Sequence, residues 1–134
     1  MSKIKIDAAD DLSVRDILHA QLTALEATAT VAEARDYFAA STSRRMALVC
    51  EDGRYVGSLT PAQLEGDLDP GLALARIAER GATVSPDDPA TKGRDLALRT
   101  DARRVAVVDA DGRLVGVVAV TGDLTSFCGT SGGD

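Results

Sequence analysis

The chain has 134 residues, of which 45% are hydrophobic, 27% charged and only 3% aromatic, and its formal net charge is −6. This length allows one ordinary domain or two very small ones. A net acidic chain with no basic stretch lacks the Lys and Arg clusters that neutralise phosphates, so we expect neither nucleic acid nor an anionic membrane surface as a partner. No apolar run approaches the roughly 20 residues that span a bilayer. The N-terminus has no apolar core of the kind found in a signal peptide, and we therefore expect a cytoplasmic protein.

The first half of the chain predicts two helices joined by a short extended segment. The first helix is expected over residues 13–20 and the second near residues 31–41. The second helix begins with a capping box, in which the side chains of Thr30 and Glu33 each bond the backbone N–H of the other residue. Apolar residues recur along this helix at the spacing of one helical face, so one side of it is expected to be buried.

A β-hairpin is predicted after the second helix, with strands over Met46–Cys50 and Tyr55–Leu59. Its turn contains Asp52 and Gly53, a pair that is favoured where both turn residues need a positive φ. A further helix is predicted to begin at Thr60.

The second half of the chain begins with a predicted helix over residues 70–80, for which Asp69 is the N-cap, Pro70 the first residue and Gly81 the stop. An extended segment follows, and then a helix that opens at Asp88 and is weakened by an internal glycine. A second hairpin and a last helix complete the prediction. The strands of this hairpin are Val105–Asp109 and Leu114–Ala119, its turn is Asp111-Gly112, and the last helix begins close to Thr121.

An internal repeat accounts for this succession of elements. Residues 44–57 read RRMALVCEDGRYVG and residues 103–116 read RRVAVVDADGRLVG, with nine of the 14 positions identical at a constant offset of 59. The same offset places residues 13–19 on residues 72–78. A unit of this size buries only about 60% of its unfolded surface and is marginal alone, so we expect the two copies to pack together, with clefts between them. The predicted division is 13–71 for the first copy and 72–127 for the second, with flexible termini at 1–12 and 128–134.

The repeated pattern resembles the cystathionine-β-synthase (CBS) domain, which has a strand, an Asp-Gly turn, a second strand ending in V-G-x-h-T (h is apolar) and a helix. Residues 45–60 carry this pattern, and residues 104–118 carry most of it again. Residues 84–90, VSPDDPA, also resemble the family's connection from its first strand to the next helix. The resemblance covers nearly the whole chain. It implies an α/β (α+β) fold of two tandem βαββα repeats packed with pseudo-twofold symmetry, known as a Bateman module.

In function, the resemblance implies a regulatory module without catalytic activity and without a required cofactor. Members of the family commonly bind an adenosine compound, such as AMP, ATP or S-adenosylmethionine, in the clefts between the repeats, and they often form dimers. We therefore expect a homodimer, an adenosine-containing ligand and a regulated partner that is either a separate chain or the homodimer itself. The alternative is a CBS pair that binds no ligand and serves for dimerisation or for contact with a partner.

The family's nucleotide signature, G-h-h-(T/S)-x-x-D, is only partly present. In the family, its hydroxyl residue contacts phosphate at a helix N-terminus and its Asp holds the ribose hydroxyls. The first copy keeps the hydroxyl at Thr60, but Gln63 replaces the Asp. The second copy has Ala119 at the hydroxyl position, and Thr121 and Asp123 are spaced differently from the signature. Thr60 and Gln63 also form a capping box, which is a purely structural alternative for both residues.

Arg45 and Arg104 directly precede the first hairpin strand of each copy, where family members often place residues that line the ligand cleft. An Arg there could bind phosphate through two hydrogen bonds. The alternative is a surface Arg whose stem lies along the sheet edge. The predicted ligand-binding residues are Thr60, Gln63, Arg45, Arg104, Thr121 and Asp123. We expect phosphate-bearing ligands to prefer the site at Thr60 and Arg45.

Neither a metal site nor a catalytic site is predicted. Cys50 and Cys128 have no second thiol or His at metal-ligand spacing. His19 is the only histidine, and no nucleophile or carboxylate motif stands beside it. The sequence contains no Gly-rich phosphate loop, no nucleophile elbow and no HExxH motif.

Overall fold

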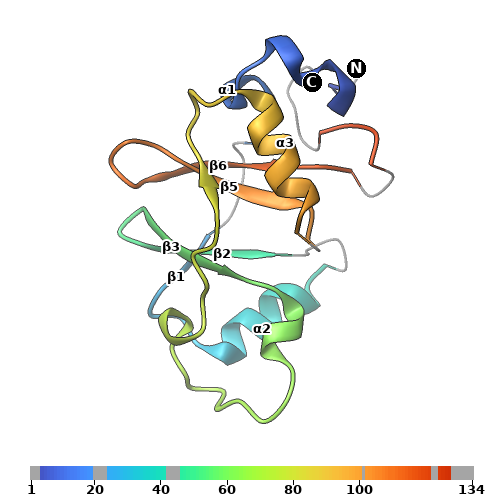
Figure 1. Cartoon of the computed structure of the whole chain (residues 1–134). Coiled ribbons are helices and arrows are strands. Elements are labelled where there is room, and N and C mark those ends of the chain that lie inside the picture. The colour runs from blue at the N-terminus through green and yellow to red at the C-terminus, as the bar shows by residue number, and fades with distance from the viewer. Residues whose placement is uncertain (1–3, 20–23, 42–45, 101, 122–123, 128–134) are drawn as a thin grey trace. The chain divides into compact units, whose positions relative to one another are not determined.

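The computed structural model describes residues 4–19, 24–41, 46–100, 102–121 and 124–127 (Figure 1). They form two three-stranded sheets with helices, which confirms the predicted mixed α/β class. The chain divides into two compact units. Thr23–Gly81 is called the central unit, and Met1–Leu22 together with Ala82–Asp134 is called the outer unit. The pseudo-twofold packing of the two repeats stays a prediction.

The central unit contains a sheet in the order β1-β2-β3 and the helix α2. The bounds are Ala24–Glu26 for β1, Ala47–Glu51 for β2, Arg54–Leu59 for β3 and Val31–Ala39 for α2. β1 is parallel to β2, and β2 is antiparallel to β3. The helix begins as predicted, because the Thr30 side chain accepts a hydrogen bond from the backbone N–H of Glu33 at 3.3 Å. Val31 and Ala34 of α2 are fully buried in one cluster with Leu59 of the sheet.

The outer unit repeats this arrangement, with the strand order β4-β5-β6 and the helix α3 (Figure 1). The bounds are Thr83–Val84 for β4, Ala90–Leu98 for α3, Arg104–Val108 for β5 and Leu114–Ala119 for β6. Gly93 lies inside α3 and is buried, and a Cβ on it would stand only 3.2 Å from Cγ2 of Val118 on β6. The glycine that weakens α3 as an isolated helix therefore lets the helix lie close against its sheet.

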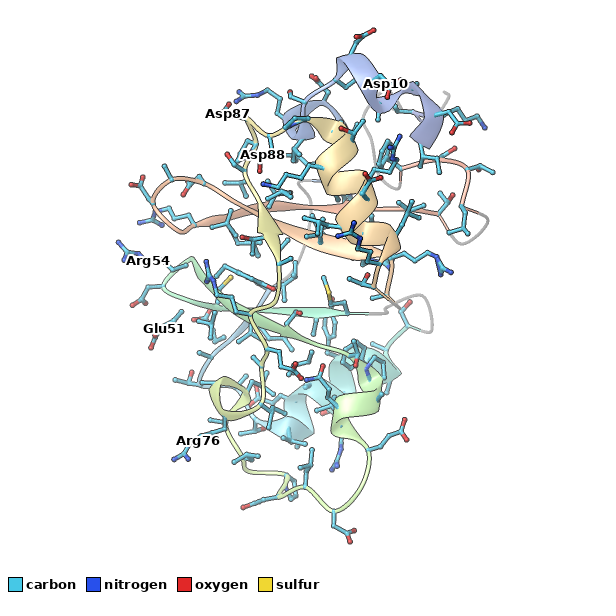
Figure 2. All side chains as sticks on the ribbon, viewed as in Figure 1. Asp10, Glu51, Arg54, Arg76, Asp87 and Asp88 are labelled. Atoms are coloured by element: carbon cyan, nitrogen blue, oxygen red, sulfur yellow. The ribbon has the colours of Figure 1, made fainter. Side chains whose placement is uncertain are left out.

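The connection from β4 to α3 is held by Asp88, which is labelled in Figure 2. The Asp88 carboxylate accepts a hydrogen bond from the backbone N–H of Ser85 at 2.8 Å and lies 3.3 Å from Nζ of Lys92. The hydrogen bond from Ser85, with a smaller contribution from Lys92, lowers the pKa of Asp88. The neighbouring Asp87 forms an ion pair with Arg15. The segment that resembles the family's strand-to-helix connection is therefore a hydrogen-bonded turn.

The structure differs from the predicted flexible terminus 1–12 over the residues it describes there. Ile6–Asp11 form a 3₁₀ helix, η1, and Ala9 within it is fully buried. The backbone N–H of Ile6 donates to the carbonyl oxygen of Thr125 at 3.1 Å, so η1 is attached to the outer unit. The predicted flexible segment 128–134 lies outside the described residues.

The last strand of each sheet also forms a backbone bridge with a segment outside the sheet. In the outer unit, His19 forms an antiparallel bridge with Val117 of β6, with N···O distances of 2.8 and 3.1 Å. In the central unit, Glu79 forms the corresponding bridge with Ser58 of β3, with distances of 2.9 and 3.0 Å. Each bridge therefore joins a strand to a segment that is distant in the sequence.

Residues 13–19 and 73–80, called the crossing segments, carry these bridges. Residues 13–19 precede the sheet of the central unit in sequence but belong to the outer unit, while 73–80 precede the outer sheet but belong to the central unit. The compact units are therefore offset from the predicted sequence division at 13–71 and 72–127.

The predicted helices over 13–20 and 70–80 are wrong in extent. Only α1, Val14–Ile17, forms in the first segment, and only the 3₁₀ helix η3, Leu74–Arg76, forms in the second. The Asp69 carboxylate accepts a hydrogen bond from the N–H of Gly71 at 2.9 Å, but no helix continues from this turn. The residues that follow α1 and η3 form backbone hydrogen bonds with β6 and β3, which a longer helix would prevent.

The crossing segments are related by an offset of 60, not by the 59 that relates the hairpins. Ser13 is bridged to Pro89, and Ala73 is bridged to Thr30. Thr30 and Pro89 stand 59 positions apart and each precedes the helix of its unit, so Ser13 is equivalent to Ala73, which is 60 positions away. The predicted alignment of the crossing segments is therefore wrong by one residue. The strand registers show the same offset of 60 for β1 and β4, so the difference falls between the first strand and the helix of each unit.

The two hairpins turn differently although both contain an Asp-Gly pair. In the first hairpin both residues of the pair have a positive φ, 54° and 82°, as predicted. In the second only Gly112 does, with a φ of 84°, so the prediction is wrong there. The reason is Asp109, whose carboxylate accepts hydrogen bonds from the N–H groups of Asp111 at 2.9 Å and Arg113 at 3.0 Å and so stabilises a three-residue loop. Cys50, which occupies the corresponding position of the first hairpin, lacks this carboxylate.

The close approach of the crossing segment to β3 depends on Gly57. A Cβ on this residue would lie 2.9 Å from the carbonyl carbon of Glu79, which is closer than ordinary contact. We therefore expect Gly57→Ala to lower the free energy of unfolding by about 1–3 kcal/mol, measured by urea denaturation. Gly71→Ala is the control, because its Cβ would have only an ordinary contact of 3.5 Å. We expect it to change stability by less than about 0.5 kcal/mol; equal stability of the two variants would contradict this account.

Candidate functional site

Thr60 and Gln63 lie together directly after β3. The capping box predicted for them is confirmed: the backbone N–H of Thr60 donates to Oε1 of Gln63 at 2.8 Å, and the Thr60 hydroxyl donates to the same oxygen at 3.3 Å. The helix that they cap is η2, Pro61–Leu64, a 3₁₀ helix of four residues. Such a short helix aligns few peptide dipoles, so it offers less to a phosphate than the longer helix that the sequence predicts at Thr60.

Gln63 joins this turn to the crossing segment of the central unit. Its Nε2 donates to the carbonyl oxygen of Ile77 at 3.3 Å and to Oε2 of Glu79 at 3.0 Å. A glutamine amide has two donor hydrogens and two acceptor lone pairs, and Gln63 uses all four within the central unit. In this arrangement Gln63 has no hydrogen-bonding group to spare for a ligand.

The position of Glu79 is determined by its backbone hydrogen bonds rather than by contacts of its side chain. Its N–H and carbonyl group are both bonded to Ser58, and the residue itself is exposed. The carboxylate therefore stands beside Gln63 at the surface of the central unit. Sequence reasoning missed this residue, because the pattern assigned it to a helix and nothing local connects it with Gln63, 16 positions away.

Tyr55 and Arg80 hold the end of the crossing segment against the sheet. The Arg80 guanidinium lies 5.5 Å from the centroid of the Tyr55 ring and donates to the Tyr55 carbonyl oxygen at 2.7 Å. The Tyr55 hydroxyl donates to the Arg80 carbonyl oxygen at 3.4 Å, and burial raises its pKa above the ordinary tyrosine value. These contacts restrict the backbone next to Glu79.

In the outer unit, Thr121 lies in a turn instead of at the start of a helix. Its hydroxyl oxygen accepts a hydrogen bond from the N–H of Ser126 at 3.2 Å, and its own N–H donates to the Ser126 carbonyl oxygen at 2.8 Å. Phe127 then returns to bridge Val120 and is fully buried. The prediction of a last helix close to Thr121 is therefore wrong, because the buried aromatic residue draws the chain back onto the sheet.

The remaining predicted site residues are only partly described. Arg104 is half-buried at the start of β5, and its guanidinium donates to the carbonyl oxygen of Ala102 at 2.7 Å. Arg104 pairs with Ala119 at the end of β6, so it shares one end of the outer sheet with Thr121. Arg45 and Asp123 lie outside the described residues.

Among the described residues, no group of three His, Cys, Asp or Glu side chains could hold a metal ion. Cys50 is buried, and burial together with the nearby Glu26 raises the pKa of its thiol, so the unreactive thiol form predominates at neutral pH. Cys128 lies outside the described residues. None of the helices in the described part of the chain is long and apolar enough to cross a membrane.

The repeated pattern of this chain matches a known protein family. The family model of the CBS domain matches residues 14–64 and 76–121. The chain belongs to the CBS domain family. Solved structures of CBS-pair proteins confirm that two such domains follow one another in this chain. No curated protein matches this CBS pair.

The similar solved structures include three that span most of this CBS pair. CBSX2 from Arabidopsis thaliana is 20% identical, has a TM-score of 0.70, and the match covers 80% of this chain and 87% of that one. CBSX2 in complex with AMP is 20% identical, with a TM-score of 0.67 and coverage of 80% and 89%. Hypoxic Response Protein I, a structure with two coordinated zinc ions, is 27% identical, with a TM-score of 0.66 and coverage of 81% and 93%.

The hydrogen bond from Gln63 to Glu79 requires a donor at position 63. Gln63→Glu keeps an acceptor for the N–H of Thr60 but sets two carboxylates against each other, so we expect a loss of about 1 kcal/mol at pH 7 in urea denaturation. Mutual repulsion raises the pKa of this pair in the folded state, so the deficit should shrink as the pH falls and protonation restores a donor.

The control for this charge is Ala62→Glu, on an exposed residue of the same η2 turn. It adds the same charge without replacing a hydrogen bond, so its effect should be smaller than that of Gln63→Glu. A Gln63→Glu protein as stable as the control at pH 7 would show that the contact with Glu79 is not formed.

Proposed function

We propose that this CBS pair is a regulatory module that binds an adenine-containing ligand of the AMP, ATP or S-adenosylmethionine type. The observation that carries the proposal is membership of the CBS family together with the similarity of the fold to CBSX2, whose structure holds AMP. The retained hydroxyl of Thr60, directly after β3, supports it. We propose no catalytic role and no required cofactor.

The ligand-binding residues in this proposal are those predicted from the sequence other than Gln63, whose amide hydrogens and lone pairs are engaged within the central unit. Thr60 and Arg45 form the preferred site for a phosphate-bearing ligand, and Arg104, Thr121 and Asp123 form the second site. We further propose that the protein is a cytoplasmic homodimer that regulates a partner protein.

A route from ligand to regulation follows from the contacts of Gln63. Gln63 joins η2 to Ile77 and Glu79, and the crossing segment that contains them leads directly into β4 of the outer unit. A ligand that displaces or reinforces these hydrogen bonds acts on the chain connection between the two units. Binding can therefore change the preferred arrangement of the module if the two arrangements differ in their affinity for the ligand.

The second candidate is a CBS pair that binds no ligand and serves for dimerisation or contact with a partner. It is favoured by the saturated hydrogen bonds of Gln63 and by the absence of an Asp at that position of the signature. Both candidates share the fold, so a binding experiment separates them.

Thermal unfolding with AMP, ADP, ATP, S-adenosylmethionine and NAD distinguishes the two candidates. A ligand at 100 times its Kd stabilises the folded state by about 2.7 kcal/mol. We expect the melting temperature to rise by roughly 5 °C or more with at least one of these compounds. Cytidine monophosphate, which lacks adenine, is the control and should give a smaller shift. The absence of any shift at millimolar concentrations would contradict the proposed function and favour the interaction module.

A further inference from the structure

We infer that Glu79 supplies the carboxylate that binds the ribose hydroxyls of the ligand, an inference that rests on the proposed function. It assigns the recognition of a vicinal diol to a residue outside the signature. The residue comes from the crossing segment that packs on β3, not from the turn that follows β3.

The position of Glu79 is determined independently of any ligand. Both backbone hydrogen bonds to Ser58 have good geometry, at 2.9 and 3.0 Å. Gly57 leaves room for the Glu79 backbone, because a Cβ on Gly57 would stand 2.9 Å from it. Arg80, the next residue, is held by its contacts with Tyr55. A side chain on such a fixed backbone loses less freedom on binding than one on a mobile loop.

The hydrogen-bonding capacity of Glu79 fits a diol, whereas that of Gln63 does not. Gln63 has both lone pairs and both donor hydrogens engaged. A carboxylate has about four acceptor sites, and the hydrogen bond from Gln63 uses one of them. Two hydroxyl donors on adjacent carbons can therefore bind the remaining sites, as an Asp or Glu binds ribose hydroxyls in dinucleotide-binding folds.

The charge of Glu79 is also available to a ligand. None of the ion pairs among the residues that the structure describes involves this carboxylate. A hydrogen bond to a charged acceptor is roughly twice as strong as a neutral one. The exposed carboxylate that Gln63 contacts therefore provides the interaction that the replacement of Asp by Gln removes from the signature.

The outer unit has no carboxylate at the corresponding position. His19 bridges Val117 as Glu79 bridges Ser58, so His19 is the equivalent of Glu79. An imidazole cannot accept two hydrogen bonds from a diol as a carboxylate does. The inference therefore predicts a ribose-binding carboxylate on the crossing segment of the central unit and none on the crossing segment of the outer unit.

Calorimetric titration of Glu79→Gln with AMP tests the inference. The variant keeps an oxygen that can accept the hydrogen bond from Gln63 but removes the charge. We expect its affinity for AMP to fall about tenfold, while its affinity for 2′,3′-dideoxy-AMP, which has no diol, matches that of the wild type. Glu65→Gln is the matched control, because Glu65 is an exposed residue just after η2 and carries the same charge; it should bind AMP like the wild type.

Each outcome decides between the inference and the proposal beneath it. If Glu79→Gln binds AMP as tightly as the wild type, or loses AMP and dideoxy-AMP affinity equally, the inference is wrong and the proposed function stands. If the wild type binds none of AMP, ADP, ATP, S-adenosylmethionine and NAD, the proposed function fails and the inference fails with it.

Discussion

The backbone bridges of the crossing segments determine which parts of the chain belong together. Ser58 and Glu79 exchange both of their backbone hydrogen bonds, as do Val117 and His19. The residues before these two strand positions are glycines in both repeats, and a Cβ on either would stand 2.9 Å from a backbone atom of the bridged segment. A side chain at either position would push the segment away from the sheet. The glycine of the repeated V-G pattern is thus a packing requirement, because it admits a second backbone to the edge of the strand.

The candidate site of the central unit depends on this arrangement. Thr60 and Gln63 come from the end of one hairpin, whereas Ile77 and Glu79 come from the segment that leads to the next repeat. The site is therefore built at the point where the chain leaves one unit for the other. A contact there can affect the connection between the units as well as the local turn, which suits the regulatory function proposed for this module.

Local signals in the sequence were enough to predict the strands, the helix after Thr30 and the capping box at Thr60. Each of these depends on residues within a few positions of one another, so a pattern of side chains contains the necessary information. The prediction of a helix over 70–80 was wrong because backbone pairing with β3 overrides the capping and stop signals. The predicted turn of the second hairpin was wrong because the carboxylate of Asp109, which lies outside the Asp-Gly pair, stabilises a three-residue loop.

The offset of the crossing segments and the position of Glu79 could not be read from the sequence. Few residues are identical between the crossing segments, and their equivalence appears only in the backbone bridges that they form with the two units. For the same reason Gln63 could be identified as a departure from the signature, but its partner could not. Arg45 and Asp123 remain sequence predictions, since they lie outside the described residues.

Amide hydrogen exchange of the two crossing segments, followed residue by residue by NMR, tests the central claim most directly. Both backbone bridges include an N–H donor in the crossing segment, at His19 and at Glu79. If these segments are integral parts of the sheets, both amides exchange only through large-scale opening and are protected like the core strand residue Val49. Exchange of His19 and Glu79 as fast as that of Asp67, an exposed residue of the loop after η2, would contradict the account.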